Sequence, residues 1–356
     1  MKATDPRFAP LSRINDSVES GWSRTLALVR VEGGVRRMLI LLAIAFVIFA
    51  ALKPSIFLSG TNLRNIALTS PEIGVLAIAM MLAMLTGGID LSLVAMANLS
   101  AITMATLFTT LAANDPSLAE QMFPIIVLVG IAVGVVGGAV NGLLISGLGI
   151  TPILATLGTM QIFNGIAVAW TGGKTLYGSP EMLTGIGSST LGGIPTLFCI
   201  FALVAIAVGI VTNRTPLGLR IQLQGANPVA ALYSGIASRK ILMSTYLLTG
   251  LLSGIAGVFF IARNPTASAD YGASYILLVI VIAVLGGTNP NGGFATVFGV
   301  VLATLTLEIV SSGFTALRLS SYQYAIAQGL ILVAAMAAEQ IKWRRRRNRK
   351  LFVRPI

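Results

Sequence analysis

Ten long apolar runs separated by short polar segments decide what this sequence can fold into. A helix needs about 20 apolar residues to cross a bilayer, and most of the runs are about that long. Only 10% of the 356 residues are charged, whereas soluble domains carry roughly 25%. The sequence therefore excludes a soluble enzyme and predicts an all-α polytopic membrane protein with about ten transmembrane helices. The runs cover about 38–57, 63–86, 91–113, 123–146, 150–171, 195–212, 241–262, 272–287, 293–312 and 322–341.

Basic residues predict how the spans are oriented. They gather in residues 1–37, in the loop 213–240 and in residues 342–356, and only five of the 24 lysines and arginines lie elsewhere. Because basic loops stay in the cytoplasm, both termini are predicted to be cytoplasmic. The domains are then a basic amino-terminal tail (1–37), a transmembrane body (38–341) that includes the loop 213–240, and a basic tail (342–356). We expect the last tail to lie on anionic membrane lipids and not on nucleic acid.

Several kinds of chemistry are absent from the sequence. There is no histidine, and the one cysteine, Cys199, lies inside an apolar run, which excludes disulfides, thiolate zinc sites and histidine proton relays. The segment 172–175 ends like a nucleotide-binding loop, but Val168 stands where that motif needs glycine. We expect this chain to bind no cofactor or metal and to have no catalytic residue.

Small residues recur at every fourth position in two spans, a pattern that lets membrane helices pack closely. We predict close helix packing at Gly130, Gly134, Gly138 and Gly142, and at Gly250 and Gly254.

Two glycine-rich segments interrupt the apolar pattern. In the first, Gly87 and Gly88 can break a helix just before Asp90. Broken helices in transporters often line the solute pathway, and a plain cytoplasmic turn is equally consistent with the sequence. The second, residues 285–293, is predicted to be a tight turn, with contact to a cytoplasmic partner as the alternative.

Polar side chains inside the spans should face the protein interior, because contact with lipid is unfavourable. Hydrogen bonds between helices would explain most of them, and contact with the solute is the alternative. Glu308 is taken as the only acid well inside an apolar run. One candidate function is therefore an ion-coupled secondary transporter that uses Asp90 or Glu308. The polar residues inside the predicted spans are Asn98, Asn141, Gln161, Asn164, Glu308 and Gln328.

The loop 213–240 contains a short predicted helix outside the membrane. Asn227 is its expected cap, Pro228 lies in its first turn and Gly235 ends it. Because such a short helix is not stable alone, its apolar side chains should dock on the chain's own spans or on a partner subunit. These side chains are Val229, Leu232, Tyr233 and Ile236.

Ordered motifs from about residue 40 to 336 resemble the permease subunits of bacterial ABC importers for monosaccharides, of the ribose type. The matched patterns are Gly-Gly-Ile-Asp-Leu-Ser at 87–92, Ala-Thr-Leu-Gly-Thr at 155–159, Thr-Gly-Gly at 171–173, and the loop pattern formed by Gly225, Asn227, Pro228, Ala230, Ala231, Ser234, Gly235 and Ile236.

The resemblance implies a permease in the bacterial inner membrane that pairs with a second copy or a sibling permease. A cytoplasmic ABC ATPase would use ATP and Mg, and a periplasmic binding protein would deliver a monosaccharide or a sugar-like solute. Segment 231–234 looks most like the permeases that carry autoinducer-2 or related sugars. The departures from the family pattern are Val229, Leu232, Ile276 and Leu278.

Two sets of site residues follow. Those implied to couple to the ATPase through a coupling helix at about 227–236 are Gly225, Asn227, Pro228, Ala230, Ala231, Leu232, Tyr233 and Gly235. The candidates for the translocation path are Gly87, Gly88, Asp90, Thr156, Asn164 and Glu308.

Overall fold

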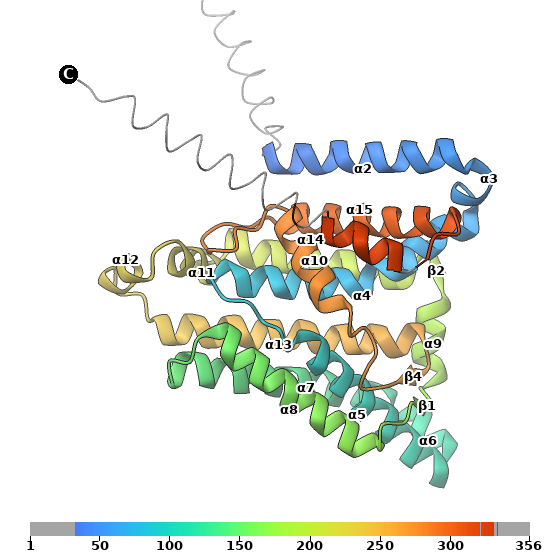
Figure 1. Ribbon diagram of the computed structural model, residues 1–356. Helices are drawn as coiled ribbons and strands as arrows, with labels where there is room; N and C mark the ends of the chain where they lie inside the picture. Colours follow the sequence, from blue (N-terminus) through green and yellow to red (C-terminus); the bar gives the residue numbers. More distant parts are fainter. Residues whose placement is uncertain (1–32, 321, 331–332, 334–356) are drawn as a thin grey trace, which may run out of the picture.

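The computed structural model describes residues 33–320, 322–330 and 333, and these residues form a helical bundle (Figure 1). In chain order the elements are α2 (Gly33–Leu52), α3 (Pro54–Phe57), α4 (Gly60–Leu85), α5 (Leu93–Asn114), α6 (Pro116–Gln121), α7 (Phe123–Gly142), the π-helical turn η2 (Leu143–Gly147), α8 (Pro152–Thr171), β1 (Leu176–Tyr177), α9 (Glu181–Ser188), β2 (Thr190–Leu191), β3 (Ile194–Pro195), α10 (Thr196–Arg214), α11 (Pro216–Ala226), α12 (Pro228–Tyr233), α13 (Ser238–Arg263), β4 (Thr266–Ala267), α14 (Tyr275–Leu285) and α15 (Val297–Ala316).

Eight helices in the described part of the chain are long and apolar enough to cross a membrane: α2, α4, α5, α7 with η2, α8, α10, α13 and α15. Each coincides with a span predicted from the sequence. The predicted span 272–287 corresponds to α14, which is apolar but has only 11 residues. Of the tenth predicted span (322–341), residues 322–330 and 333 are described and are helical, whereas its other residues, most of tail 1–37 and all of tail 342–356 lie outside the described residues. The number of spans and the position of the termini therefore stay predictions.

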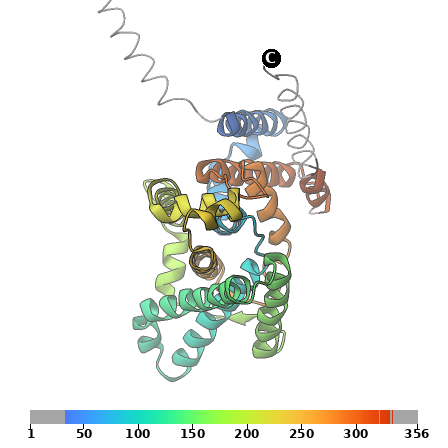
Figure 2. The same cartoon turned by 90° about the vertical axis from the view of Figure 1, so that its left-hand side faces the viewer.

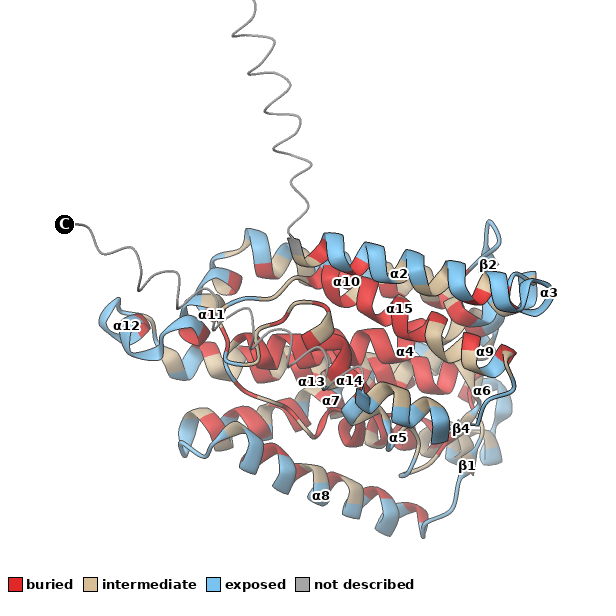
Figure 3. Ribbon diagram, turned by 45° about the horizontal axis from the view of Figure 1, so that its top comes forward, coloured by how far each residue is buried: buried red, intermediate tan, exposed pale blue. Residues whose placement is uncertain are grey.

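Helix α13 is the central helix of the bundle. Viewed from its end it lies in the middle, surrounded by the other helices (Figure 2). Most of α4 and α13 is buried, whereas α2 and α8 turn exposed apolar faces outward (Figure 3). An exposed apolar face on a long helix suits lipid or another protein chain, as expected of a multi-pass membrane protein.

The glycine pattern is confirmed as a packing device inside one chain. A Cβ atom at Gly134 would overlap the backbone of Gly250 and Gly254, and one at Gly138 would overlap Tyr246 and Gly250. Glycine therefore allows the backbones of α7 and α13 to approach closely.

The two ends of the bundle are built differently. At one end, α11 and α12 project beyond the long helices (Figure 1). At the other end lie α3, α6, α9 and two short antiparallel strand pairs, β1 with β4 and β2 with β3. The orientation predicted from the basic residues places the α12 end in the cytoplasm and the α9 end outside.

Candidate functional site

The short helix α12 forms as the sequence predicts. The Asn227 side chain accepts a hydrogen bond from the Ala230 backbone N–H at 3.0 Å, and Pro228 occupies the first turn. The chain leaves the helix through Gly235, whose φ of +76° favours glycine. Helix α12 is shorter than the predicted 227–236, because Ser234 already caps it.

Helix α12 has an exposed apolar side. Val229, Leu232 and Tyr233 are 63%, 64% and 88% exposed, whereas Ala231 is buried and Ile236 is half-buried against the chain's own helices. Docking on the chain's own helices is therefore observed for one side of the segment, whereas the other side has no cover among the described residues. The coupling roles of these residues stay predictions.

Gly225 fits the end of α11 against both helix interruptions. A Cβ atom there would overlap the Leu85 carbonyl oxygen, and would lie 2.7 Å from the Gly293 nitrogen. The Gly293 N–H itself donates to the Leu85 oxygen at 3.0 Å. A Cβ at Gly292 would lie 2.9 Å from the Gly87 nitrogen. The end of α11 is therefore in direct contact with the ends of the segments that follow α4 and α14.

The second interruption, residues 285–293, is confirmed as a tight turn. The Asn289 N–H donates to the Phe294 oxygen at 2.9 Å, and the Asn289 side chain donates to Gly292 and accepts from the Asn291 N–H. Positive φ angles at Gly287, Gly292 and Gly293 explain why glycine is used there.

Asp90 lies in a closed polar cluster between α4 and α5 and is completely buried. Its Oδ1 accepts hydrogen bonds from the Ser92 N–H at 3.0 Å and the Ser92 hydroxyl at 2.6 Å. Its Oδ2 accepts from the Thr249 hydroxyl of α13 at 3.1 Å. The carboxylate is therefore satisfied by the protein itself and ties the interrupted segment to the central helix.

Further hydrogen bonds extend this cluster to α7 and α8. The Asn141 amide donates to the Ser92 hydroxyl at 2.7 Å and accepts from Thr159 at 2.6 Å. Thr156 accepts from the Leu91 N–H at 3.1 Å. The structure thus brings together Gly88, Asp90 and Thr156 from the predicted path set. We call Asp90, Ser92, Asn141, Thr156, Thr159 and Thr249 the Asp90 cluster.

A second buried acid, Glu72 on α4, was missed by the sequence analysis, which wrongly took Glu308 as the only acid inside an apolar run. Its side chain is 0% exposed, and its Oε2 lies 3.1 Å from the Arg263 Nη1. The Tyr271 hydroxyl donates to the same oxygen at 3.0 Å. The other oxygen, Oε1, has no hydrogen-bond partner in the part of the chain described.

Glu308 lies on α15 next to the same part of α4. Its Oε2 accepts a hydrogen bond from the Thr69 hydroxyl at 2.6 Å. Nearer the end of the bundle, the Ser312 hydroxyl donates to Asn62 at 2.8 Å. Asn62, Asn65, Thr69 and Glu72 recur at intervals of three, four and three residues, so they lie on one face of α4. We call these four residues the α4 stripe.

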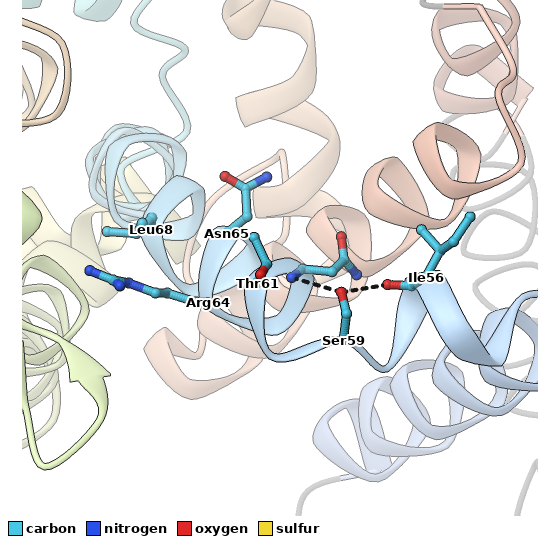
Figure 4. Close-up of a pocket in the computed structure, with 7 residues that line it drawn as sticks. Ile56, Ser59, Thr61, Arg64, Asn65 and Leu68 are labelled. Carbon is cyan, nitrogen blue, oxygen red and sulfur yellow. Dashed lines mark hydrogen bonds between the residues drawn. The ribbon is translucent and has the colours of Figure 1, made fainter.

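Two adjacent hollows open at the α9 end of the bundle. The larger, of about 580 Å³, is lined by residues of α4, α9 and the end of α13, including Arg64, Glu181 and Arg263. The other, of about 460 Å³, lies on α3 and the first turns of α4 and shares Arg64 and Leu68 with the first. Figure 4 shows Thr61, Arg64, Asn65 and Leu68 projecting from α4 around it.

Other predicted residues are more dispersed. Asn98 confirms the interior expectation, because its amide donates to the Ala269 and Tyr271 carbonyls at 2.8 and 2.9 Å. Gln161 contradicts it, since its side chain is exposed on α8, a peripheral helix with an outward face. Asn164, also on α8, has a buried oxygen with no partner among the described residues and joins neither cluster.

The described residues hold no group of three or more histidine, cysteine or acidic side chains that could bind a metal. The expectation that this chain binds no cofactor stays a prediction.

Comparison with known proteins adds independent evidence. Residues 62–336 match the family described as branched-chain amino acid transport system / permease component. The chain is 31% identical to the D-allose transport system permease protein of Escherichia coli (strain K12), over 85% of this chain and 90% of that protein. It is 32% identical to the ribose import permease protein of Bacillus subtilis (strain 168), over 85% and 91%.

An autoinducer 2 import system permease protein from Escherichia coli is 27% identical over 88% of this chain and 94% of that protein. No solved structure matches the chain significantly.

Proposed function

This chain belongs to the permease family of the branched-chain amino acid transport systems, and we propose that the solute it carries is a monosaccharide or a sugar-like molecule. Members of the family are permease components of ABC importers, so the chain is a transport subunit and not an enzyme. ATP hydrolysis belongs to a separate subunit. The observation that carries the proposal is the similarity, over nearly the whole chain, to permeases for D-allose and ribose.

The family description names branched-chain amino acids, whereas the similar relatives are named for sugars and autoinducer 2. The relatives support a sugar, because the two named for sugars each match 85% of the chain, at the similar identities of 31% and 32%. That near-equality does not favour one sugar over another. Autoinducer 2, which segment 231–234 suggested, gains no special support, since that relative is the least similar of the three compared.

The exposed side of α12 supports a cytoplasmic ABC ATPase as the partner. An apolar surface made of Val229, Leu232 and Tyr233 lies at the tip of the bundle, away from the long apolar helices. Gly225, in the adjoining α11, contacts both interrupted segments. Motion of a bound ATPase would therefore reach the membrane helices through α11.

The outward face of α8 supports pairing with a second permease, either another copy or a sibling. Gln161 is exposed in the middle of this span, where contact of an amide with lipid would be unfavourable. A neighbouring protein chain would supply hydrogen-bond partners. A periplasmic sugar-binding protein would meet the opposite end of the bundle from α12, in the inner membrane of a bacterium.

Uptake measurements test the function directly. Cells lacking this chain and cells in which it is restored are given labelled D-ribose, D-allose, D-galactose or L-leucine. We expect restored uptake of at least one sugar, and uptake that continues when proton and sodium gradients are collapsed at constant ATP. Restoration of leucine uptake alone would refute the sugar assignment. Loss of uptake with the gradients would favour the ion-coupled alternative.

Capture of partners tests the coupling surface. Tagged wild-type protein and a double variant with Leu232→Asp and Tyr233→Asp are each purified in detergent from the native membrane. We expect the wild type to retain an ABC ATPase and the double variant to lose it, because two charges would replace an apolar contact. Tyr177→Asp is the matched control, since Tyr177 is 74% exposed on β1, far from α12. Equal ATPase recovery from all three proteins would refute this surface.

A further inference from the structure

The α4 stripe leads from the surface of the bundle into its interior. Asn65 is exposed, Thr69 is half-buried and Glu72 is fully buried, although all three lie on one face of the helix. Three members already pair with other helices: Asn62 with Ser312, Thr69 with Glu308, and Glu72 with Arg263. Polar groups in a span avoid lipid, so this face of α4 turns toward protein or toward a water-filled path.

The hollows connect this stripe to the outside. Asn65 lines the smaller hollow, and Arg263 lines the larger one while its guanidinium contacts the buried Glu72 at 3.1 Å. Arg263 is thus the only residue of the ion pair that faces the hollow, with 26% of its side chain exposed against 0% for Glu72. It covers the acid from the open side.

Glu72 retains an unused acceptor. Its Oε2 takes hydrogen bonds from Arg263 and Tyr271, but its buried Oε1 has no partner among the described residues. A buried polar atom without a partner is unfavourable unless something else satisfies it. The ring of Tyr271, whose hydroxyl donates to Glu72, packs edge-on against Phe260 and Tyr275, with ring centroids 4.7 and 6.2 Å away.

We propose that the α4 stripe is a binding wall for a neutral polyhydroxylated solute, in which Glu72 accepts a solute hydroxyl and Arg263 closes the site over it. This inference rests on the proposed sugar function and adds the location of the site. Carboxylates at Glu72 and Glu308 accept hydrogen bonds and repel anions, and the amides of Asn62 and Asn65 both donate and accept. Few, well-placed polar groups beside aromatic rings are typical of small-molecule sites.

The single cysteine makes a direct test possible. Asn65→Cys is introduced into the full-length chain, in which Cys199 has been replaced by serine. The protein is placed in lipid nanodiscs, so that the reagent has access to both sides of the membrane. Its rate of modification by a negatively charged thiol reagent is measured with increasing D-ribose, D-allose or D-galactose. Ser117→Cys is the matched control, because Ser117 is exposed on α6, at the same end of the bundle but outside the hollows.

We expect a transported sugar to slow the modification of Asn65→Cys and to leave that of Ser117→Cys unchanged. Adding Glu72→Gln should raise the sugar concentration for half-protection about tenfold, as expected for the loss of one charge-assisted hydrogen bond. Modification without sugar should stay at the same rate, which a purely structural defect would alter. If Glu72→Gln alone does not fold, the pair Glu72→Gln with Arg263→Gln removes both charges and serves the same purpose.

The inference is overturned if a sugar that the wild type imports fails to protect Asn65→Cys, or if protection is as strong with Glu72→Gln as without it. Protection by L-leucine in place of every sugar would also overturn it. If the wild type imports none of the sugars, the proposed function itself fails and the inference falls with it.

Discussion

The Asp90 cluster and the α4 stripe are two ways of burying an acid in the same bundle. Both touch the central helix α13, at Thr249 and Arg263, which are 14 residues or about 21 Å apart along the helix. Both oxygens of Asp90 accept hydrogen bonds from the protein, and no salt bridge joins Asp90 to a basic side chain among the described residues. Glu72 instead forms an ion pair with Arg263, which lines the larger hollow, and one of its oxygens has no hydrogen-bond partner in the described residues.

We infer from this difference that a buried acid in a transporter need not lie on the solute path. Asp90 ties the segment after α4 to α13 through hydrogen bonds, so we propose a structural role for it. Glu72 keeps an unused acceptor next to a hollow, so we assign it to the solute. Four predictions test this comparison, beginning with the largest expected effect.

Replacing Asp90 with leucine should destabilise the protein most. The Ser92 N–H, the Ser92 hydroxyl and the Thr249 hydroxyl would lose their buried acceptor, which costs about 3 kcal/mol in free energy of unfolding. Thermal unfolding of the purified chain in a mild detergent measures the loss.

Asp115 is a matched control for that change. Its Oδ1 also accepts from the N–H and hydroxyl of the serine two residues later, at 2.9 and 2.7 Å, but it is exposed between α5 and α6. Asp115→Leu should therefore lower stability much less. Equal losses from Asp90→Leu and Asp115→Leu would contradict the importance of burial.

Adding a methyl group at two glycines compares how tightly the protein is packed near Asp90 and at the larger hollow. Gly88→Ala would bring a Cβ within 2.5 Å of the Tyr246 hydroxyl and 3.1 Å of Pro152, so overpacking should destabilise by about 2 kcal/mol. Gly185→Ala, in α9 at the larger hollow, meets nothing within 4 Å. It should leave stability unchanged or improve it by up to about 1 kcal/mol, because alanine favours a helix. Thermal unfolding measures the change in stability for both variants. A destabilised Gly185→Ala would contradict the open space that the structure leaves beside Gly185.

Glu72→Gln should alter transport far more than stability. The guanidinium of Arg263 can be hydrated from the hollow once its partner is neutral, so the free energy of unfolding should fall by only about 1 kcal/mol. The same thermal unfolding measures this change. A loss as large as that from Asp90→Leu would mean that Glu72 is a structural acid as well.

Acid should reveal the smallest effect, at Asp115. Hydrogen bonds from Ser117 and Leu118 hold the pKa of the Asp115 carboxyl below its usual range. A lowered folded pKa means that the carboxylate stabilises the protein above its unfolded pKa and that this contribution is lost as pH falls through the folded pKa. Asp115→Asn should therefore show a slightly flatter decline of stability below about pH 4 than the wild type. An identical decline would show that the exposed carboxylate adds nothing.

The sequence predicted the membrane helices and α12 well, because both depend on local signals. Apolar runs of bilayer length predicted the long helices, and Asn227, Pro228 and Gly235 predicted the cap, first turn and end of α12. Asp90 was recognised as notable because glycines interrupt the helix before it. Its structural contacts could not be read from its sequence neighbours, because Thr249, which donates to Asp90, lies 159 residues away, and Asn141, which donates to Ser92 in the same cluster, lies 51 residues from Asp90.

Glu72 was missed although a signal was present. Asn62, Asn65, Thr69 and Glu72 have the spacing of one helix face, but the apolar residues around them hide the stripe when each span is read as a run. Its partner Arg263 was counted only as a basic residue beyond a span. Their pairing depends on how α4 and α13 pack, which composition and local pattern do not encode.

The most direct measurement compares sugar uptake per folded molecule for Glu72→Gln and Asp90→Asn. Membranes carrying each variant are assayed for the initial rate of uptake of the imported sugar, divided by the amount of correctly folded chain. We predict that Glu72→Gln lowers this rate about tenfold, through the loss of one charge-assisted hydrogen bond, while Asp90→Asn lowers mainly the amount of folded chain. Full uptake per molecule with Glu72→Gln, and its loss with Asp90→Asn, would contradict the account.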